Sequence, residues 1–304
     1  MIRVLVTGSG GQVGAEVVRE LAGRAEVVAL DRAALDLADP ASIAAGVHAA
    51  RPDVIVNCAA YTAVDRAETD REAAHAVNAV GPGVLAAAAK RCGALLVHFS
   101  TDYVYDGTKR SPYVETDAAN PLSVYGATKL EGERAVAASG ASHVILRTSW
   151  VYGARGKNFL FTMLRLGRER SELRVVDDQR GAPTSSRALA RVVREILDRG
   201  GDTDELTRAE VDEVAAASGI YHATAAGSTT WFGFAQAIFE EMQRQRRLDF
   251  AAPRLSAIPT AEYPTPARRP ANSVMSTGRL RDTFGVTLAD WRDGLCEVVS
   301  ALPD

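Results

Sequence analysis

Short apolar runs alternate with amphipathic stretches through the first half of the chain. The runs have the length of buried strands, and the stretches between them place apolar residues at helical spacing. The predicted strands are Ile2–Val6, Glu26–Leu30, Val54–Val56, Ala94–Phe99 and His143–Leu146. The predicted helices are a stretch ending at Leu21, one that starts at the capping pair Asp39–Pro40, Asp70–Arg91, and Leu122–Ala138. Because such units connect by right-handed crossovers, the pattern predicts an α/β fold with a doubly wound parallel sheet covered on both faces.

The second half of the chain has a different character. From about Val151 prolines become frequent, and the alternation of strands and helices becomes irregular. We therefore expect one domain over residues 1–170. Residues 171–304 are expected to form mainly a smaller C-terminal lobe, with some segments returning to the first domain. The stretch Thr203–Ser218 is acidic and polar at first and then helical in pattern, and it is interpreted as a solvated surface insertion; a last helix is expected over Asp290–Val299.

Composition and charge narrow the class of protein. The 304 residues are 47% hydrophobic and 24% charged, which excludes a disordered chain, and the net charge of −3 favours neither a nucleic acid nor a membrane surface as partner. No stretch has the length of a membrane span, and the first apolar run is too short for a signal peptide. The three cysteines are odd in number and far apart, so neither a disulfide framework nor a metal site is expected. A cytoplasmic protein fits these features.

A glycine-rich loop follows the first predicted strand and precedes the first predicted helix. Gly8, Gly11 and Gly14 form the pattern GxxGxxG, and Gly10 allows a second reading from Gly8. A diphosphate needs backbone N–H groups at close range and a helix N-terminus facing its charge, and glycines permit both. This context predicts a Rossmann-type NAD(P)-binding domain over residues 1–170. The alternative is a tight strand-to-helix turn without a ligand.

Two charged residues end the second predicted strand, about 20 residues after the loop. Asp31 can accept hydrogen bonds from the adenosine ribose, which favours NAD(H). Arg32 can bind a 2′-phosphate, which favours NADP(H). The two residues thus favour different cofactors. We expect NADPH as the cofactor, with NADH as the alternative.

Three residues form a candidate catalytic group. Tyr125 and Lys129 are four residues apart on a predicted helix and therefore share one face. An ammonium group one turn from a phenol is expected to lower the pKa of the phenol and to reach ribose hydroxyls. Thr101 follows a predicted strand, at the edge where open α/β sheets bind ligands, and can hydrogen-bond a carbonyl oxygen. The alternative is a surface helix pair with Tyr125 packed on the core.

These residues resemble the extended short-chain dehydrogenase/reductases, which carry a Ser or Thr, a Tyr and a Lys in these places. Within them, the chain is most similar to the dTDP-4-dehydrorhamnose reductase family, over almost its whole length. The segments that carry this resemblance are Gly11–Gly14, Asn57–Asp65, Ser100–Gly107, Tyr125–Lys129, Arg147–Gly153, Gly181–Thr184, Gly219–His222 and Pro266–Pro270.

The resemblance implies an NAD(P)H-dependent oxidoreductase. Its substrate would be a dTDP-sugar, a dTDP-4-dehydro-6-deoxy-L-hexose whose 4-keto group is reduced, and the chain would act as a monomer or homodimer. Other nucleotide-deoxysugar 4-ketoreductases share every segment named above. An epimerase of the same superfamily and a noncatalytic regulatory subunit of the methionine adenosyltransferase type are further alternatives.

The resemblance also implies roles for individual residues. Tyr125 would give a proton to the C4 oxygen, Lys129 would hold the nicotinamide ribose, and Thr101 would orient the carbonyl. The positions that match the sugar pocket are Asp102, Tyr103 and Trp150. The positions that match the surroundings of the cofactor are Gly11, Gln12, Val13, Asp31, Asp36, Leu37, Ala60, Tyr61 and Thr62.

Several residues keep two interpretations. Asn78 resembles the asparagine of a proton relay, but it could equally bend its helix. Arg268 and Arg269 could bind the substrate diphosphate or lie on an exposed loop. His98, in an apolar strand, is interpreted as a core residue rather than a catalyst.

Two further interpretations concern the second half of the chain. Trp231, Phe232 and Phe234 are expected to begin a helix and belong to a core. Arg187 stands where some relatives have a cation-binding glutamate, so we expect no metal.

Overall fold

The computed structural model describes residues 1–200 and 205–303, and its centre is a six-stranded sheet in the order β2-β1-β3-β4-β5-β10. Every neighbouring pair in this sheet is parallel. The strands are β1 (Arg3–Thr7), β2 (Glu26–Leu30), β3 (Val54–Asn57), β4 (Leu95–Thr101), β5 (His143–Thr148) and β10 (Gly219–His222). The strand order reverses direction between β1 and β3, which is the point where doubly wound sheets bind ligands. The expected doubly wound α/β fold is confirmed.

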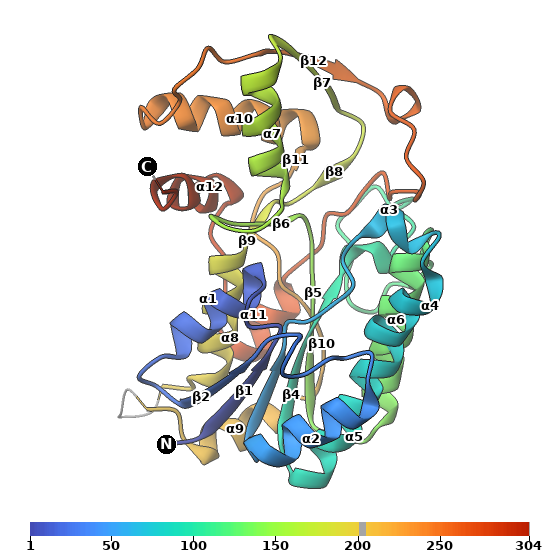
Figure 1. Cartoon of the computed structure of the whole chain (residues 1–304), viewed down its shortest axis with the longest axis vertical. Helices are drawn as coiled ribbons and strands as arrows, with labels where there is room; N and C mark the ends of the chain where they lie inside the picture. The colour runs from blue at the N-terminus through green and yellow to red at the C-terminus, as the bar shows by residue number, and fades with distance from the viewer. Residues whose placement is uncertain (201–204, 304) are drawn as a thin grey trace.

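Helices cover both faces of the sheet (Figure 1). One face carries α1 (Gln12–Leu21), α8 (Ser186–Leu197), α9 (Arg208–Ala216) and α11 (Gly278–Phe284). The other face carries α2 (Pro40–Ala50), α5 (Gly81–Cys92) and α6 (Val124–Ala138). Asp39 caps α2 by accepting from the Ala41 amide, as its place before Pro40 predicts. Within the described residues, no helix is long and apolar enough to cross a membrane.

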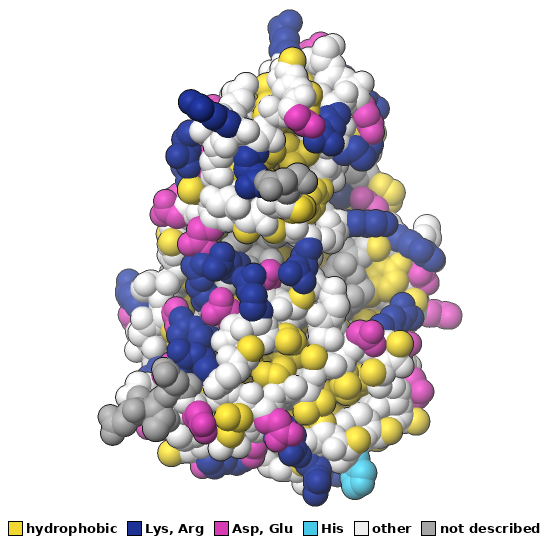
Figure 2. All heavy atoms as spheres, turned by 60° about the vertical axis from the view of Figure 1, so that its left-hand side comes forward, with side chains coloured by type: hydrophobic (Ala, Val, Ile, Leu, Met, Phe, Trp, Pro, Cys, Tyr) yellow, Lys and Arg dark blue, Asp and Glu magenta, His cyan; other side chains and the backbone are white. Residues whose placement is uncertain are grey.

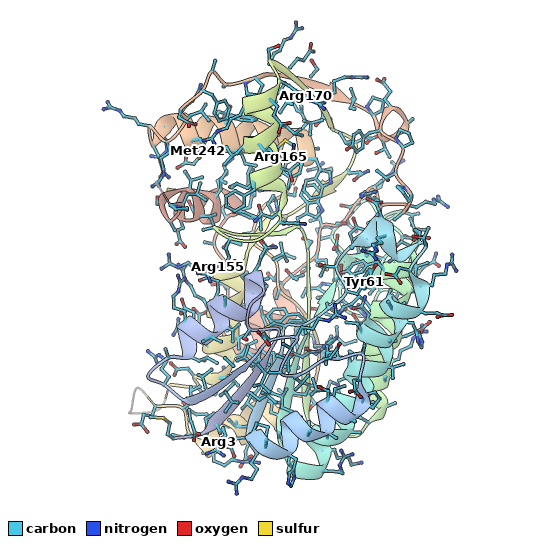
Figure 3. The ribbon with its side chains drawn as sticks, in the orientation of Figure 1. Arg3, Tyr61, Arg155, Arg165, Arg170 and Met242 are labelled. Atoms are coloured by element: carbon cyan, nitrogen blue, oxygen red, sulfur yellow. The ribbon has the colours of Figure 1, made fainter. Side chains whose placement is uncertain are left out.

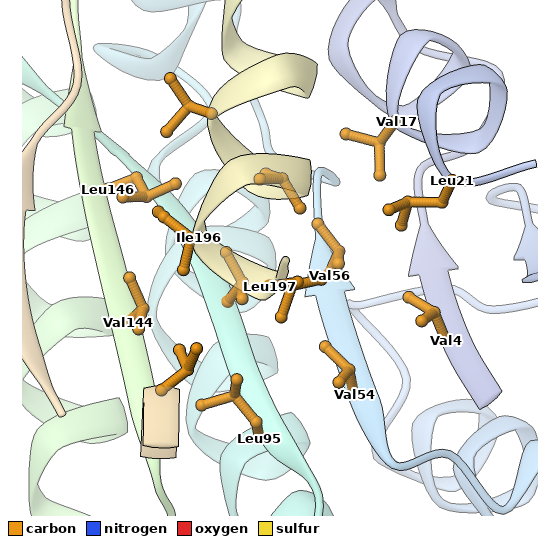
Figure 4. Close-up of a cluster of buried hydrophobic side chains, with 14 of the residues drawn as sticks. Val4, Val17, Leu21, Val54, Val56, Leu95, Val144, Leu146, Ile196 and Leu197 are labelled. Carbon is orange, nitrogen blue, oxygen red and sulfur yellow. The ribbon is translucent and has the colours of Figure 1, made fainter. Parts of the chain in front are cut away.

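The alternation of side chains along each strand builds two separate cores. Val4 and Val6 of β1 point to the face of α1 and α8, whereas Leu5 between them points to the face of α2 and α5. Figure 4 shows the first of these cores, in which Val17 and Leu21 of α1 approach the strands. Strands that are apolar at every position are therefore those that helices cover on both faces.

The predicted long helix Asp70–Arg91 is interrupted. It consists of α4 (Arg71–His75), a π-helical turn η1 (Ala76–Val80) and α5, preceded by the short helix α3 (Val64–Ala67). A Cβ atom added at Gly132 of α6 would lie only 2.1 Å from the Asn78 carbonyl oxygen, so α6 passes directly over the π-helical turn. No residue pattern marked this turn, because π-helical turns depend on such local packing.

The other elements of the second half of the chain form a smaller lobe above the carboxyl ends of the strands (Figure 1). Its core contains Phe234, which lies on α10 near Trp231, the first residue of that helix, as predicted. Its elements are β6 (Val151–Tyr152), α7 (Phe159–Glu169), β7 (Glu172–Val176), β8 (Arg180–Gly181), β9 (Thr184–Ser185), β11 (Thr229–Thr230), α10 (Trp231–Arg244), β12 (Arg254–Ile258), η3 (Thr260–Glu262) and α12 (Trp291–Ser300). The boundary between residues 1–170 and 171–304 stays a prediction.

The interpretation of Thr203–Ser218 as a solvated insertion is wrong for its described part; Thr203 itself lies outside the described residues. Leu206, Val211 and Val214 are buried in the core that also contains α1 and α8. Thr207 and Glu210 form a reciprocal capping box at the start of α9. The polar residues occupy one face of this helix, and its apolar face covers the sheet beside β4 and β5.

Candidate active site

A cavity of about 870 Å³ runs along the carboxyl ends of the central strands. Among the residues predicted for the cofactor, catalysis and the sugar pocket, Gly14 alone is absent from its lining. The predicted residues that line it are Gly8, Gly11, Gln12, Val13, Asp31, Arg32, Asp36, Leu37, Ala60, Tyr61, Thr62, Thr101, Asp102, Tyr103, Tyr125, Lys129 and Trp150. In Figure 3, Tyr61 lies beside α3 and α4 on one side of the molecule, and Arg155 lies near α1 on the other.

The glycine loop owes its shape to close backbone contacts. Gly8 has a φ of +64°, and a Cβ atom there would lie 2.8 Å from the Ala59 backbone. A Cβ atom at Gly14 would lie 2.3 Å from the Gly8 carbonyl oxygen. Gly10 differs, because its Cβ position has no atom within 4 Å although the residue lines the cavity. Gly8 and Gly14 therefore shape the turn, and Gly10 keeps space open beside it.

We predict opposite effects for alanine at two positions of this loop. Gly14→Ala should lower the melting temperature of the free protein, because the new methyl group collides with backbone that cannot move away. Gly10→Ala should leave the melting temperature almost unchanged and weaken NADPH binding by about tenfold or more. Differential scanning fluorimetry and a fluorescence titration with NADPH measure the two effects. Equal NADPH affinity in Gly10→Ala and the unaltered protein would contradict the assignment of this space to the cofactor.

The residues around the loop fit a dinucleotide. Helix α1 begins at the loop without any side-chain cap, so its first amide groups stay available to an anion. Elsewhere in the cavity lining, the Thr148 hydroxyl is buried and has no hydrogen-bond partner in the structure. A buried hydroxyl without a partner is costly, and a ligand group in the cavity would satisfy it.

The side chains of Asp31 and Arg32 differ in exposure and in the hydrogen bonds that they already form. The Asp31 carboxylate accepts hydrogen bonds from the amides of Ala33 and Ala34, at 3.0 and 3.1 Å. The Arg32 side chain is 83% exposed, and its contact with Asp36 is long, at 3.5 Å. One oxygen of Asp31 is therefore already used by its own turn, whereas Arg32 is able to turn toward a phosphate at the cavity rim.

Asn78 forms hydrogen bonds with the backbone of Tyr61, in a segment that the sequence analysis expects around the cofactor. The side chain of Asn78 accepts from the Tyr61 amide at 2.8 Å and donates to the Tyr61 carbonyl oxygen at 3.1 Å. Asn78 is fully buried in the π-helical turn and does not line the cavity. Of the two interpretations left open by the sequence, these contacts favour a structural role, namely fixing the backbone of Tyr61 between Ala60 and Thr62.

The candidate catalytic residues meet at the centre of the cavity. Thr101 is the last residue of β4; its hydroxyl donates to Asp102 at 3.0 Å and accepts from the Tyr103 amide at 3.2 Å. Tyr125 and Lys129 lie in the first turns of α6, which Ser123 caps. Because β4 ends where α6 begins, the hydroxyl, the phenol and the amine share one side of the cavity.

The pKa values in this group differ from the expected ones. Burial raises the pKa of Tyr125 to about 12, and the neighbouring Thr101 hydroxyl offsets only part of this effect. Burial lowers the pKa of Lys129 to about 8, against the opposite effect of Glu133. The Lys129 amine donates to the Phe99 carbonyl oxygen at 2.7 Å. The net shift of the Tyr125 pKa is therefore upward, whereas the sequence analysis expected Lys129 to lower it, because burial is the largest cause of the shift.

Asp102 and Tyr103 form the wall next to the phenol. Burial raises the pKa of Asp102 to about 6, with hydrogen bonds from Ser273 and Thr101 opposing it. The Tyr103 ring meets the Tyr125 ring edge to face, with centroids 5.4 Å apart. This packing keeps water away from one side of the phenol and leaves the cavity side open.

Trp150 is held in an unusual backbone conformation. Its φ of +50° lies in the left-handed region, which is strained for a bulky residue. Trp231 stacks on it with centroids 3.6 Å apart and donates to Gln179 at 3.2 Å. A Cβ atom at Gly181 would lie 2.5 Å from the Trp150 ring, so the indole is enclosed from that side too. Trp231 was interpreted only as a core residue; its stacking on Trp150 depends on tertiary contacts that no sequence motif indicates.

The loop after β6 contributes residues that the sequence analysis missed. Lys157 lines the cavity, and its carbonyl oxygen accepts from Gln12 at 3.4 Å. Asn158 donates to the other end of the Gln12 amide group at 2.9 Å. More than 140 residues separate these partners in the chain, so only the tertiary structure brings Lys157 to the glycine loop.

The two arginines near the C-terminus have different environments. Arg269 is ion-paired with Asp65 at 2.8 Å, and the same carboxylate accepts from the Ala267 amide. Arg268 is exposed, and neither arginine lines the cavity. A role for Arg268 or Arg269 in binding a diphosphate stays a prediction.

Basic side chains gather between the two lobes on the side that is on the left in Figure 1, as Figure 2 shows. Three ion pairs on α1, α8 and α12 involve arginines: Arg155–Glu16, Arg194–Glu20 and Arg191–Glu297.

Among residues 1–200 and 205–303, no group of three or more His, Cys, Asp or Glu side chains could hold a metal ion. The expected absence of a metal remains a prediction.

The model of one protein family, described as the RmlD substrate binding domain, matches residues 2–303. The chain belongs to this family. The dTDP-4-dehydrorhamnose reductase of Burkholderia thailandensis is 52% identical over 303 residues, which cover 97% of this chain and 98% of that protein. The resemblance to this reductase family is confirmed.

Two further relatives bear on substrate and cofactor. A probable dTDP-4,6-dihydroxy-2-methyloxan-3-one 4-ketoreductase of Streptomyces antibioticus is 41% identical, and the match covers 100% of this chain and 95% of that protein. The crystal structure of dTDP-4-dehydrorhamnose reductase from Bacillus anthracis in complex with NADP has a TM-score of 0.87 at 34% identity. It covers 98% of each chain.

Proposed function

We propose that this chain is a dTDP-4-dehydrorhamnose reductase, which uses NADPH to reduce the 4-keto group of dTDP-4-dehydro-L-rhamnose to give dTDP-L-rhamnose. One observation carries the proposal: Thr101, Tyr125 and Lys129 face the same cavity that the glycine loop opens. The full-length identity of 52% with a reductase of this name supports the choice of substrate. The exposed Arg32 at the cavity rim supports NADPH over NADH.

When bound, NADPH supplies the hydride that the C4 carbon receives. Tyr125 donates its phenolic proton to the C4 oxygen, and its raised pKa keeps it protonated until then. Thr101 turns its hydroxyl from Asp102 to the carbonyl oxygen and orients it. Lys129, as an ammonium group, stabilises the phenolate that Tyr125 becomes. The stacked pair Trp150 and Trp231 offers an apolar wall for the sugar.

The direct test is an assay of NADPH and NADH oxidation with dTDP-4-dehydro-L-rhamnose, followed by identification of the product. Loss of reduced nicotinamide in proportion to dTDP-L-rhamnose formed is expected, faster with NADPH. A chain that binds the sugar and NADPH without turnover would contradict the proposal and favour a noncatalytic regulatory subunit.

A second substrate deserves the same assay, because the relative from Streptomyces antibioticus is named for a different deoxysugar. If the 2-methyloxan-3-one substrate is reduced with the higher kcat/KM, the chain is a 4-ketoreductase of that kind. An epimerase would interconvert sugars without net consumption of NADPH. The cytoplasmic location and the monomeric or dimeric state stay predictions.

The rate should depend on pH through Lys129. Its pKa of about 8 means that the amine is charged below this pH and loses its charge as the pH rises through it. Because the ammonium form stabilises the phenolate, kcat/KM for NADPH, which reports the free enzyme, should fall about tenfold per unit above about pH 8. Steady-state rates measured from about pH 6 to 10 test this, and a flat profile up to about pH 9.5 would contradict it.

A further inference from the structure

A buried chain of hydrogen bonds reaches Lys129 from the side opposite the cavity. His98, on β4, is fully buried. Its Nδ1 atom lies 2.9 Å from Nδ2 of Asn57, and its Nε2 atom lies 3.2 Å from Nζ of Lys129. The sequence analysis interpreted His98 as a core residue only. Its burial agrees with that, but its contact with Lys129 places it directly behind the candidate catalytic amine.

The orientation of the Asn57 amide determines which nitrogen of His98 carries the proton. The Asn57 side-chain oxygen accepts from the Ala59 amide at 3.2 Å and from the Thr7 hydroxyl at 2.6 Å. A backbone amide can only donate, so the oxygen has to face Ala59 and the Asn57 NH₂ group has to face His98. His98 Nδ1 therefore accepts a hydrogen bond, and the proton of the neutral ring lies on Nε2.

This tautomer has a consequence for Lys129. An Nε2–H group points at Nζ, and an ammonium group offers only N–H donors in return. A neutral amine accepts that hydrogen bond and still donates to the Phe99 carbonyl oxygen. Burial, together with the Lys129 charge, holds the pKa of His98 well below its ordinary value, so the ring stays neutral.

Two titratable groups lie one turn from Lys129 on its own helix. Glu133, one turn further along α6, favours the ammonium form, but its carboxylate is already bound to Arg147 by three hydrogen bonds. Tyr125 lies one turn before and is neutral at physiological pH because burial raises its pKa. β3 contributes Asn57, which does not titrate. Cys58, the next residue, lines the same cavity, and burial raises the pKa of its thiol, so it stays neutral. His98 is thus the polar group that opposes the charge on Lys129 from β4.

We propose that His98 is a positioning residue for the reaction: Asn57 holds it in the Nε2–H tautomer, and it directs Nζ of Lys129 toward Phe99 while lowering the affinity of this amine for a proton. The consequence for catalysis rests on the proposed function, whereas the tautomer and the proton affinity of Lys129 do not. The arrangement keeps the lysine able to gain and lose a proton near neutral pH.

Nuclear magnetic resonance on the free protein tests the geometry without any assay. Long-range proton–nitrogen spectra of the imidazoles should show His98 with a protonated Nε2 and a bare Nδ1, unchanged from about pH 6 to 9. The His98→Gln variant assigns the signal among the five histidines. A proton on Nδ1, or a ring that titrates in this range, would overturn the proposal.

The variant Asn57→Asp reverses the arrangement. Its carboxylate still accepts from Ala59 and Thr7, but it now accepts from His98 too, which moves the ring proton to Nδ1 and leaves Nε2 as an acceptor for an ammonium group. The chain has four lysines, so carbon-13 signals of the lysine side chains report the titration of Lys129 directly. We expect its midpoint to rise by about one pH unit or more, and the decline of kcat/KM to move with it.

The matched control is His222→Gln. His222 is the other fully buried histidine, and it binds Tyr105 and the Ser276 carbonyl oxygen rather than Lys129. The substitution His222→Gln should change the stability of the protein and leave the pH midpoint of the Lys129 titration unchanged. If the His98 tautomer switches in Asn57→Asp but the pH midpoint of the Lys129 titration does not move, the proposal for His98 is overturned. If the midpoint moves but the chain reduces no substrate, the proposed function is overturned instead. If Asn57→Asp fails to fold, the spectra of the unaltered protein decide the question alone.

Discussion

Tyr125→Phe is expected to lower kcat by about a thousandfold while changing NADPH affinity by less than about twofold. The phenolic hydroxyl lines the cavity beside Thr101 and can give a proton to the C4 oxygen, and phenylalanine has no proton to give. The ring itself is retained, so the edge-to-face contact with Tyr103 and the packing at the start of α6 persist. The loss should therefore appear in the chemical step rather than in folding or cofactor binding.

Single-turnover kinetics with saturating NADPH measure this effect, and a fluorescence titration measures cofactor affinity. Tyr103→Phe is the matched control, because it removes a phenol from the same ring pair and should reduce kcat far less. A kcat in Tyr125→Phe within about tenfold of the unaltered enzyme would show that another group supplies the proton.

Arg147→Leu is expected to produce the largest loss of stability, about 3–5 kcal/mol in the free energy of unfolding. Arg147 on β5 is buried and forms a two-pronged ion pair with Glu133 of α6; its third nitrogen donates to the Tyr105 hydroxyl at 2.7 Å. Glu133 also accepts from Ser100. Removing the guanidinium leaves a carboxylate buried without its cation, which costs more than the pair contributes when intact.

Urea unfolding followed by circular dichroism measures the change. The double variant Arg147→Leu with Glu133→Leu should recover much of the loss, because no buried charge remains. Arg165→Ala breaks the exposed ion pair with Glu169 and should cost less than about 0.5 kcal/mol. If Arg147→Leu unfolds at the same urea concentration as the unaltered protein, the pair does not hold α6 to the sheet.

The order of elements and the place of the site were predictable from local features. Strand-length apolar runs and helical spacing are properties of neighbouring residues, and right-handed crossovers convert their order into one sheet topology. The glycine loop, Thr101 and the Tyr125–Lys129 pair all follow predicted strands or lie on a predicted helix. Once the sheet is parallel, the carboxyl ends of its strands lie at one edge, which brings these residues to one cavity.

The protonation states of Tyr125 and Lys129 were not predictable from such local features. The spacing of Tyr125 and Lys129 indicates that they share a helix face, but it does not show how deeply they are buried. Burial is the largest cause of both pKa shifts: it raises the pKa of Tyr125 and lowers that of Lys129. The direction in which the Lys129 amine points depends on Phe99 and His98, whose position next to α6 follows from packing.

The sequence by itself determined the alternating α/β order, the glycine loop, the candidate catalytic trio and the family, because each depends on residue types at short, regular spacing. Only the tertiary structure decided the π-helical turn at Asn78, the burial of α9, the stacking of Trp231 on Trp150, and the chain of hydrogen bonds from Asn57 to Lys129. These features join segments that are distant in the chain. Their contacts form only when whole elements pack, and neither propensity nor periodicity encodes that packing.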